Sequence, residues 1–297
     1  MFKNKFIIFI LFVISFNFGN FAYAEALNNK KLRVLPLEYS AFDSLLLLGI
    51  KPIAYAKGEV GEGDIPSYLQ EAIKGLPSVG TRQQPNLEKI IELKPDLIIA
   101  DPFFHNDIKK QVEKIAPTIF LKGITANYSE QLANLEMLAE VTNKKDKVSA
   151  IKQKFNDAMK PIITLGNANR GTILIGYVHT NGVFRALTAN AIATDFLSKI
   201  GQENVIKSYD QKQRTAITME GILAKNPDNI IVLLTNGDME PFEFFKRHPL
   251  WRKISAVEKA NVYFFDRDVW AKSHGISANM QKIKDIQESS ILVKKVK

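Results

Sequence analysis

The amino-acid sequence predicts an α/β protein made of two doubly wound lobes that are joined by one long helix. Three observations support this fold class. A short helix followed by a buried strand occurs once in each half of the chain, further strand candidates surround both copies, and a glycine-free helical stretch separates the halves. The length that remains after removal of an export signal, about 273 residues, also suffices for two cores, because single cores stop growing at about 250 to 300 residues.

The beginning of the chain has the pattern of an export signal. Lys3 and Lys5 precede an apolar run over residues 6–18, and the triplet 22–24 is Ala-Tyr-Ala. Positive charge, apolar run and an A-x-A triplet follow one another in this order in secretion signals. The run is shorter than the roughly 20 apolar residues of a spanning helix. We therefore expect residues 1–24 to be a cleaved signal peptide, the alternative being an uncleaved membrane anchor.

Composition excludes several classes of protein. The sequence has no cysteine, which rules out thiolate metal sites and lipid attachment to an N-terminal cysteine. Its formal net charge of +9 is spread along the chain, without the aromatic-interleaved basic stripe of nucleic-acid-binding modules. We expect no nucleic-acid partner and a periplasmic protein that is not a lipoprotein. No direct metal site is expected either, because the four histidines are scattered at His105, His179, His248 and His274.

An internal repeat makes residues 87–99 similar in sequence to residues 219–231. Each copy has a glutamate, Glu88 or Glu220, then Pro-Asp seven residues later, then a pair of isoleucines. The apolar spacing predicts a short helix that stops before the proline and leads into a buried strand. A parallel strand rich in Ile and Leu needs helices on both faces, so two such units predict two α/β lobes.

The remaining elements lie on both sides of one long helical stretch. Residues 128–165 carry apolar side chains at helical spacing, with a break near 143–146, and we expect a rigid helix of about 28 Å over 147–165. Further strands are expected at residues 31–37, 52–56, 118–121, 172–177 and 261–265. The predicted domains are an N-terminal lobe over residues 25–142, a linker helix over 143–166 and a C-terminal lobe over 167–297.

Several segments resemble periplasmic iron-siderophore-binding proteins. The likeness covers nearly all of the mature chain and rests on residues 34–45, 48–53, 78–88 and 94–99 for the family as a whole, and on 249–251 and 270–276 for its ferric citrate-binding members. The resemblance implies a receptor with a ligand cleft between its lobes, which delivers an anionic iron chelate to the permease and ATPase of an ABC importer. It further implies a monomer without a cofactor. Ferric citrate is the preferred ligand; another siderophore, hydroxamate or catecholate, or haem is the alternative.

A chelate with several carboxylates needs cationic and hydrogen-bonding partners, and arginine meets a carboxylate with two parallel hydrogen bonds. Arg82 precedes the first repeat helix, and the resemblance makes it a ligand contact; the alternative is a surface salt bridge. Arg214 takes the corresponding place before the second repeat helix. The loop after the strand 172–177 supplies His179 and, further on, Arg185, which otherwise belong to an exposed polar loop. Tyr39 follows the first strand and can donate a hydrogen bond.

Three more candidates follow the last expected strand, in the segment where the resemblance implies ligand contacts. Trp270 is expected either to form a wall of the cleft or to lie in the core. Lys272 and His274 stand where ferric citrate-binding relatives have arginines. The charge of His274 is expected to depend on pH, since an ordinary histidine titrates near 6.5. Glu38 would repel an anion unless it is paired, so it is not among the candidates.

Glu88 and Glu220 are the matched acids of the repeat. The resemblance implies that one exposed glutamate on each lobe docks to arginines of the importer. The alternative is a purely local role, because a carboxylate in the first turn is favoured by the helix dipole. We do not expect an enzyme, since no G-x-G-x-x-G, P-loop or G-x-S-x-G motif follows a strand; a nucleotide-binding enzyme is the remote alternative.

Overall fold

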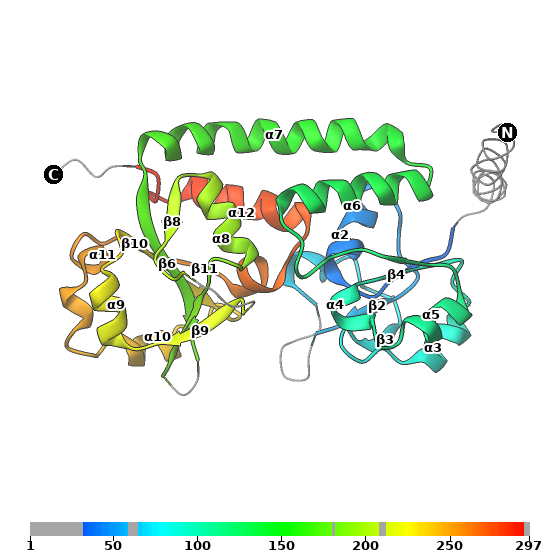
Figure 1. Ribbon diagram of the computed structural model, residues 1–297, viewed down its shortest axis with the longest axis horizontal. Helices are drawn as coiled ribbons and strands as arrows, with labels where there is room; N and C mark the ends of the chain where they lie inside the picture. The colour runs from blue at the N-terminus through cyan, green and yellow to red at the C-terminus, as the bar shows by residue number, and fades with distance from the viewer. Residues whose placement is uncertain (1–31, 59–64, 180–181, 208–211, 294–297) are drawn as a thin grey trace, which may run out of the picture.

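The computed structural model describes residues 32–58, 65–179, 182–207 and 212–293. The expected signal peptide lies outside these residues. The described chain forms two α/β lobes, with a long helix, α7 (Lys145–Ala168), running across both of them (Figure 1). None of the helices in this part of the chain carries an apolar stretch that could cross a bilayer. The predicted fold class is confirmed.

The N-terminal lobe contains two small parallel sheets. Its main sheet has the strand order β1-β4-β5, formed by β1 (Val34–Pro36), β4 (Leu97–Ala100) and β5 (Thr118–Phe120). The second sheet pairs β2 (Tyr55–Lys57) with β3 (Ser78–Thr81). The helical elements of this lobe are α2 (Tyr39–Leu47), η1 (Ser67–Leu69), α3 (Leu87–Leu93), α4 (Pro102–His105), α5 (Lys109–Ile115) and α6 (Tyr128–Val141).

The C-terminal lobe is built on one mixed sheet. Its strand order is β11-β10-β6-β7-β9, and β8 also pairs with β6. The strands are β6 (Gly171–Val178), β7 (Phe184–Leu187), β8 (Gln202–Asn204), β9 (Arg214–Ile217), β10 (Asn229–Leu234) and β11 (Val262–Asp266). The helical elements are α8 (Ile192–Lys199), α9 (Met219–Lys225), α10 (Glu240–Phe245), η2 (Trp251–Lys253), α11 (Ser255–Glu258), η3 (Asp268–Lys272) and α12 (Ile276–Glu288). This sheet is mixed, because β7 runs antiparallel to both β6 and β9.

The sequence repeat corresponds to two equivalent units, α3–β4 and α9–β10. Asn86 caps α3 by accepting from the backbone of Lys89 at 3.0 Å, and Thr218 caps α9 through Gly221 at 3.1 Å. Both helices end on a residue in the left-handed conformation just before Pro-Asp. This conformation satisfies the last carbonyl groups of a helix and turns the chain sharply into the strand. The local sequence therefore specifies each unit.

Two helices, and not one, connect the lobes. Helix α7 begins two residues before and ends three residues after the expected span, and it packs against α6 and α12. At its far end Gly166 lies so close to α8 that an added Cβ would stand 1.9 Å from the carbonyl oxygen of Ile200. Helix α12 returns to the N-terminal lobe, where Asn279 donates to Gln131 at 2.7 Å. A single core cluster contains residues of both lobes, so the linkage is stiff.

Candidate ligand-binding site

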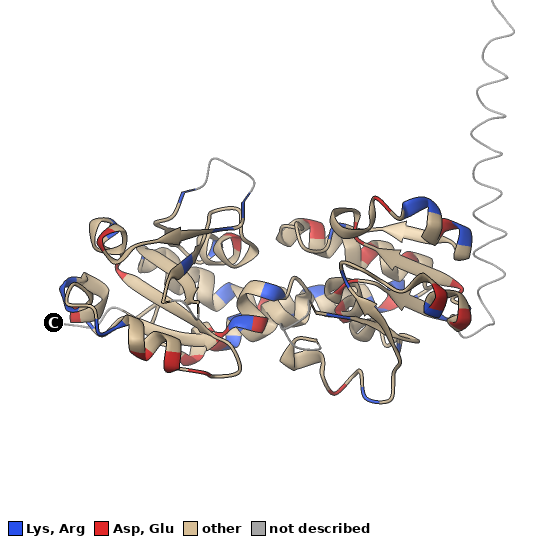
Figure 2. Ribbon diagram, turned by 90° about the horizontal axis from the view of Figure 1, so that it is seen from below, with Lys and Arg blue, Asp and Glu red and all other residues tan. Residues whose placement is uncertain are grey.

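The strand ends of the two lobes meet at their junction. Ser67, on η1 between the two strands of the second sheet of the N-terminal lobe, donates to Asp266 at the end of β11 with a distance of 3.0 Å. Gln213, beside β9, donates to the backbone oxygen of Ile124 at 3.2 Å. Figure 2 shows the lobes side by side with helices between them. Open α/β sheets place their binding crevices at the carboxyl ends of the strands, so this junction is the candidate site.

A buried ion pair organises the N-terminal half of the junction. The Arg82 guanidinium donates to the Glu38 carboxylate at 3.0 Å, and both residues are buried. Its central carbon lies 4.0 Å from the ring centroid of Tyr39 and 5.3 Å from that of Phe104. Burial by itself would raise the pKa of Glu38, but Arg82 and hydrogen bonds from Ser40 hold that pKa below its ordinary value. Glu38 is therefore the charged partner of Arg82.

This pairing changes the expectation for Arg82. The salt bridge that was its alternative role is present, although in the interior and not on the surface. The Nε atom of Arg82 is buried without a hydrogen-bond partner, so it keeps one donor available at the junction. Tyr39, the other predicted residue of this lobe, is 3% exposed and lies against the guanidinium.

Two residues that sequence reasoning missed hold the loops around this pair. The Asp101 carboxylate accepts from the backbone nitrogens of Phe103, Gly123 and Ile124, and so ties α4 to the loop after β5. The ring of His105 lies between the backbone of Asp101 and the carbonyl oxygen of Arg82, 2.7 Å away. An Asp-Pro pair directly after a buried strand was the signal that could have indicated Asp101, because it marks a capped helix start.

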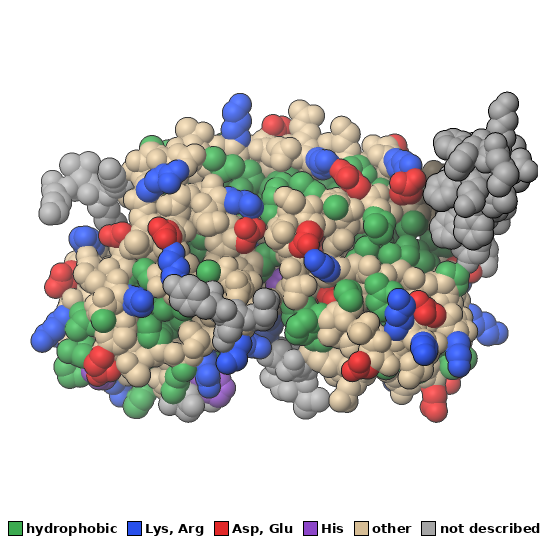
Figure 3. Space-filling view, in the orientation of Figure 1, with side chains coloured by type: hydrophobic (Ala, Val, Ile, Leu, Met, Phe, Trp, Pro, Cys, Tyr) green, Lys and Arg blue, Asp and Glu red, His purple; other side chains and the backbone are tan. Residues whose placement is uncertain are grey.

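Three arginines surround Tyr177 on the C-terminal side. Arg214 donates to the Tyr177 hydroxyl group at 3.4 Å, and Arg185 stands opposite Tyr177 in the β6–β7 ladder. The Arg267 guanidinium carbon lies 4.0 Å from the ring centroid of Tyr177, and its Nη1 donates to Thr235 at 3.4 Å. In Figure 3, blue Lys and Arg side chains gather at the lower inner edge of this lobe, over β9.

This Tyr177 cluster, defined as Tyr177 with Arg185, Arg214 and Arg267, joins two predicted residues to one that was missed. Arg267 directly follows the last strand of the sheet, which is the position that could have indicated it. His179, also predicted, is exposed beyond the end of β6, where its backbone carbonyl accepts from Gly182 at 2.8 Å in the turn toward β7.

The structure corrects the expectation that Trp270 forms a wall of the cleft. Its side chain is fully buried, its ring stacks on Phe265 with centroids 5.0 Å apart, and its Nε1 donates to Asp285 at 2.7 Å. The core role that was its alternative is the one observed. Lys272 is paired with Asp268 at 3.0 Å, and its side chain is only 11% exposed.

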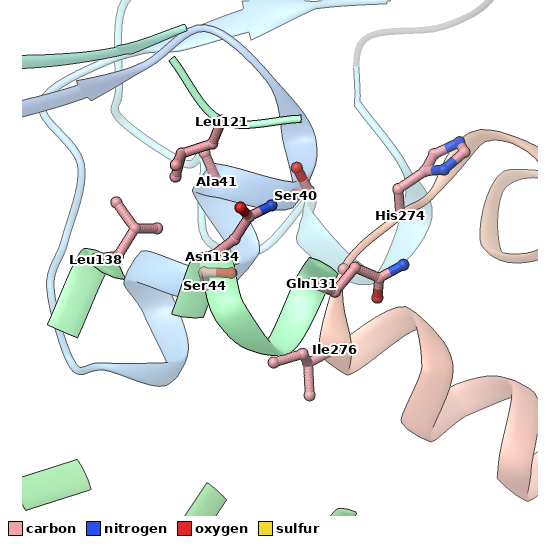
Figure 4. Close-up of a pocket in the computed structure, with 10 residues that line it drawn as sticks. Ser40, Ala41, Ser44, Leu121, Gln131, Asn134, Leu138, His274 and Ile276 are labelled. Atoms are coloured by element: carbon pink, nitrogen blue, oxygen red, sulfur yellow. The ribbon is translucent and has the colours of Figure 1, made fainter. Parts of the chain in front are cut away.

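His274 is also buried, and it lines a small cavity. Figure 4 shows the cavity between α2, α6 and the start of α12, and its polar lining includes Ser40, Ser44, Gln131 and Asn134. Neither ring nitrogen of His274 has a hydrogen-bond partner. Burial lowers the pKa of His274 to about 3, opposed by Glu38 and reinforced by Lys282 and Arg82. The expected charge change of His274 near neutral pH is therefore not supported, because its imidazole is neutral there.

These features define a class of protein: a two-lobe receptor with polar groups where the strand ends meet and a stiff helical connection. The chain belongs to the family of periplasmic binding proteins, whose pattern it matches over residues 34–269.

Individual relatives show the same family. The chain is 33% identical over 258 residues to YfmC of Bacillus subtilis, named an Fe(3+)-citrate-binding protein, with coverage of 86% of this chain and 79% of that protein. It is 29% identical over 273 residues to FecB of Escherichia coli, named an Fe(3+) dicitrate-binding periplasmic protein, with coverage of 91% and 89%. The crystal structure of SirA from Staphylococcus aureus superposes with a TM-score of 0.75 at 21% identity, covering 88% of this chain and all of that one, and supports the fold.

Proposed function

We propose that this protein binds an anionic iron(III) chelate in the periplasm, with ferric citrate as the preferred ligand, and delivers it to the permease and ATPase of an ABC importer. The Tyr177 cluster carries the proposal, because the guanidinium groups of Arg214 and Arg267 both contact Tyr177 and Arg185 stands opposite it in the β6–β7 ladder. Forked donors suit a ligand that presents several carboxylates. The names of the two citrate-binding relatives point to the same chemistry.

The two lobes take different parts in this proposal. Arg185, Arg214 and Arg267 bind carboxylate oxygens, and Tyr177 holds two of these side chains in place. In the N-terminal lobe the Arg82 charge is already balanced by Glu38, so Arg82 contributes its spare Nε donor and Tyr39 its hydroxyl group. The negative charge of the ligand is therefore balanced mainly by the arginines of the C-terminal lobe. Among the other predicted contacts, His179 is exposed just beyond β6, Lys272 is paired with Asp268, and neutral His274 can act only as a hydrogen-bonding group.

The proposal extends to whether the protein carries a lipid anchor and to its oligomeric state. Some relatives are named as lipoproteins, among them YhfQ and YfiY of Bacillus subtilis. This sequence has no cysteine to which lipid could be attached, so we propose a form without a lipid anchor. We further propose that the protein acts as a monomer and is not an enzyme.

The ligand is tested by calorimetric titration of the mature protein with ferric citrate, a hydroxamate siderophore, a catecholate siderophore and haem. We expect a dissociation constant for ferric citrate of about 1 µM or tighter. The double variant Arg214→Met with Arg267→Met should bind ferric citrate about 100-fold more weakly, since each charge-assisted hydrogen bond contributes about 1.5 to 3 kcal/mol. Arg252→Met, an exposed arginine on η2, is the control and should bind normally. Tight binding of haem or another siderophore without binding of ferric citrate would reject this ligand.

Glu88 and Glu220 are the proposed contacts with the importer. Each is exposed in the first turn of its repeat helix, and α3 and α9 lie on different lobes in the lower half of Figure 1. Changing both to lysine should abolish uptake of iron-55 supplied as ferric citrate while the calorimetric affinity stays unchanged. The control, Glu136→Lys with Glu203→Lys, makes the same charge change on α6 and β8, in the upper half of the figure, and should transport normally. Loss of ligand binding in the Glu88/Glu220 variant would contradict the docking role.

A further inference from the structure

Lys282, on α12, has its side chain in the interior of the protein. The residue is fully buried, and no other lysine of the described residues is buried. In Figure 1, α12 lies below α7 and between the two lobes. Lysines are almost never fully buried unless an acid pairs with them, because an isolated ammonium ion is costly to remove from water. The contacts of Lys282 therefore need to be explained.

The amine of Lys282 contacts neutral oxygen atoms. Its Nζ atom donates to Asn279 Oδ1 at 3.1 Å and to the backbone oxygen of Ser273 at 3.4 Å. Among the described residues, no acid forms an ion pair with it. An ammonium group has three N–H donors, whereas a neutral amine has two. The two acceptors therefore match the neutral form of this amine.

The proton of this amine is weakly held in the folded protein. Burial lowers the pKa of Lys282 from its ordinary value of 10.5 to about 7. Asp285, one turn further along α12, opposes this shift. However, the carboxylate of Asp285 accepts from Trp270 at 2.7 Å and from Gln281 at 2.9 Å, and not from the amine. In neutral solution Lys282 is therefore close to the point at which it gains or loses its charge.

The elements packed against α12 do not balance a charge on Lys282. Asp43, on α2, accepts from the backbone of Ser277 at 2.9 Å, and on η3 Lys272 is paired with Asp268 at 3.0 Å. The buried side chains of α6 and α7 include no titratable group. A proton on Lys282 would therefore be a net positive charge in the interior of the described chain.

This amine lies close to the lobe junction. Ser273, which accepts from Lys282, directly precedes His274, and Figure 4 shows His274 on the segment that leads into α12. Besides burial, the charges of Glu38, Lys282 and Arg82 all act on the pKa of His274. His274 is therefore within electrostatic reach of both the amine and the buried ion pair. An anion at the junction would act on the same amine.

We propose that Lys282 is a specificity-determining residue, whose buried amine takes up a proton when a chelate of net negative charge binds at the lobe junction. This inference rests on the proposed function. A nearby anion stabilises the charged form of an amine and so raises its pKa. Between the lower pKa of the free protein and the higher pKa of the complex, binding is linked to proton uptake. A chelate without net charge gains nothing from this amine, so Lys282 favours anionic ligands.

The test compares the original protein with Lys282→Met, Lys282→Gln and the control Lys284→Met, which changes an exposed lysine of the same helix. Glutamine removes the proton-binding group but keeps a donor for Asn279, so it carries the test if the melting temperature shows that Lys282→Met does not fold. Each protein is titrated with ferric citrate in a calorimeter at pH 8, once in HEPES and once in Tris. The two buffers differ in ionisation enthalpy, so the difference in heat gives the number of protons taken up.

We expect the original protein and Lys284→Met to take up about 0.5 to 1 proton more per bound ligand than either Lys282 variant. Relative to those variants, their affinity for ferric citrate should also fall by up to about tenfold for each unit of pH above about 7, since one proton is linked to binding. Changes of ferric citrate itself with pH are common to all four proteins and cancel in this comparison.

Two results would overturn the role of Lys282 while leaving the proposed function intact. Equal proton uptake by all four proteins would assign the proton to another group, such as Asp43. An equal loss of proton uptake in Lys284→Met would show an effect of surface charge and not of the buried amine. If the original protein does not bind ferric citrate at all, the proposed ligand fails, and this inference fails with it.

Discussion

Replacing Glu38 by methionine should lower the free energy of unfolding by about 3 to 5 kcal/mol, because the buried guanidinium of Arg82 would lose its carboxylate partner. The pair is among the most deeply buried charged groups of the described chain, with side chains 2% and 5% exposed. Water cannot replace the lost partner at such a site. Urea unfolding at neutral pH, monitored by circular dichroism, measures the change.

The double variant Glu38→Met with Arg82→Met separates charge from packing. Removing both charges leaves no buried ion without a partner, so we expect it to recover most of the stability lost in Glu38→Met. Stability losses that simply add in the double variant would show that the two side chains do not act as a pair. The same variant should bind ferric citrate more weakly, since it lacks the Arg82 Nε donor.

Substitution of Asp43 by asparagine should remove a pH-dependent loss of stability. Asp43 is a buried residue of α2 whose carboxylate accepts from the backbone of Ser277 at 2.9 Å, at the start of α12. Burial raises the pKa of Asp43 to about 6 from its ordinary value of 3.8; hydrogen bonds from Ser277 and Ile276 oppose this rise, and the Glu38 charge adds a smaller contribution to it. The folded protein therefore binds the Asp43 proton more tightly than the unfolded chain does.

The sign of the effect follows directly. A raised pKa in the folded state stabilises the protein fully below about pH 3.8, and this contribution is lost as the pH rises through about 6. The shift corresponds to about 3 kcal/mol. Asparagine stays neutral and can still accept from Ser277, so Asp43→Asn should match the original protein near pH 4 and exceed its stability at pH 8. Titrations shared by both proteins cancel in this difference.

Urea unfolding between pH 4 and pH 8 checks the prediction. Asp43→Ala is the control, because it removes the charge and the hydrogen bond together and should be less stable than Asp43→Asn at every pH. Parallel stability curves for the original protein and Asp43→Asn would show that Asp43 does not titrate as proposed. The contact is close, since a Cβ added at Gly275 would stand 2.3 Å from the Asp43 carboxylate. Asp43 therefore links the first helix of one lobe to the last helix of the chain.

Local patterns predicted much of this fold. The two repeat units and their stop before Pro-Asp were predicted, because apolar spacing and the restriction that proline imposes act within a few positions of the chain. The long helix was predicted within three residues at each end for the same reason. By contrast, the second connection through α12 depends on contacts between segments far apart in the sequence. Strand β7 was not among the expected strands, although it pairs with the neighbouring strand β6.

For the candidate site, too, the sequence indicated some features and only the tertiary structure showed the others. The sequence indicated Arg82, Arg185 and Arg214, since arginines beside strand ends suit an anionic ligand, but it did not indicate that Arg82 is paired with Glu38. Trp270 and His274 were equally visible in the sequence, and burial decided their roles: one is a core ring, and the other is neutral.

By itself the sequence determined the two α/β units, the helix between them and the residue types available to meet an anion, because these follow from short-range spacing and side-chain chemistry. Only the tertiary structure decided which charges are balanced inside the protein and which gather at the lobe junction. Arg82 and Arg267 are chemically identical, but a carboxylate 44 positions earlier in the chain neutralises the first, whereas the ring of Tyr177, 90 positions earlier, positions the second. Desolvation and pairing arise from neighbours that folding brings together, and those neighbours are not adjacent in the sequence.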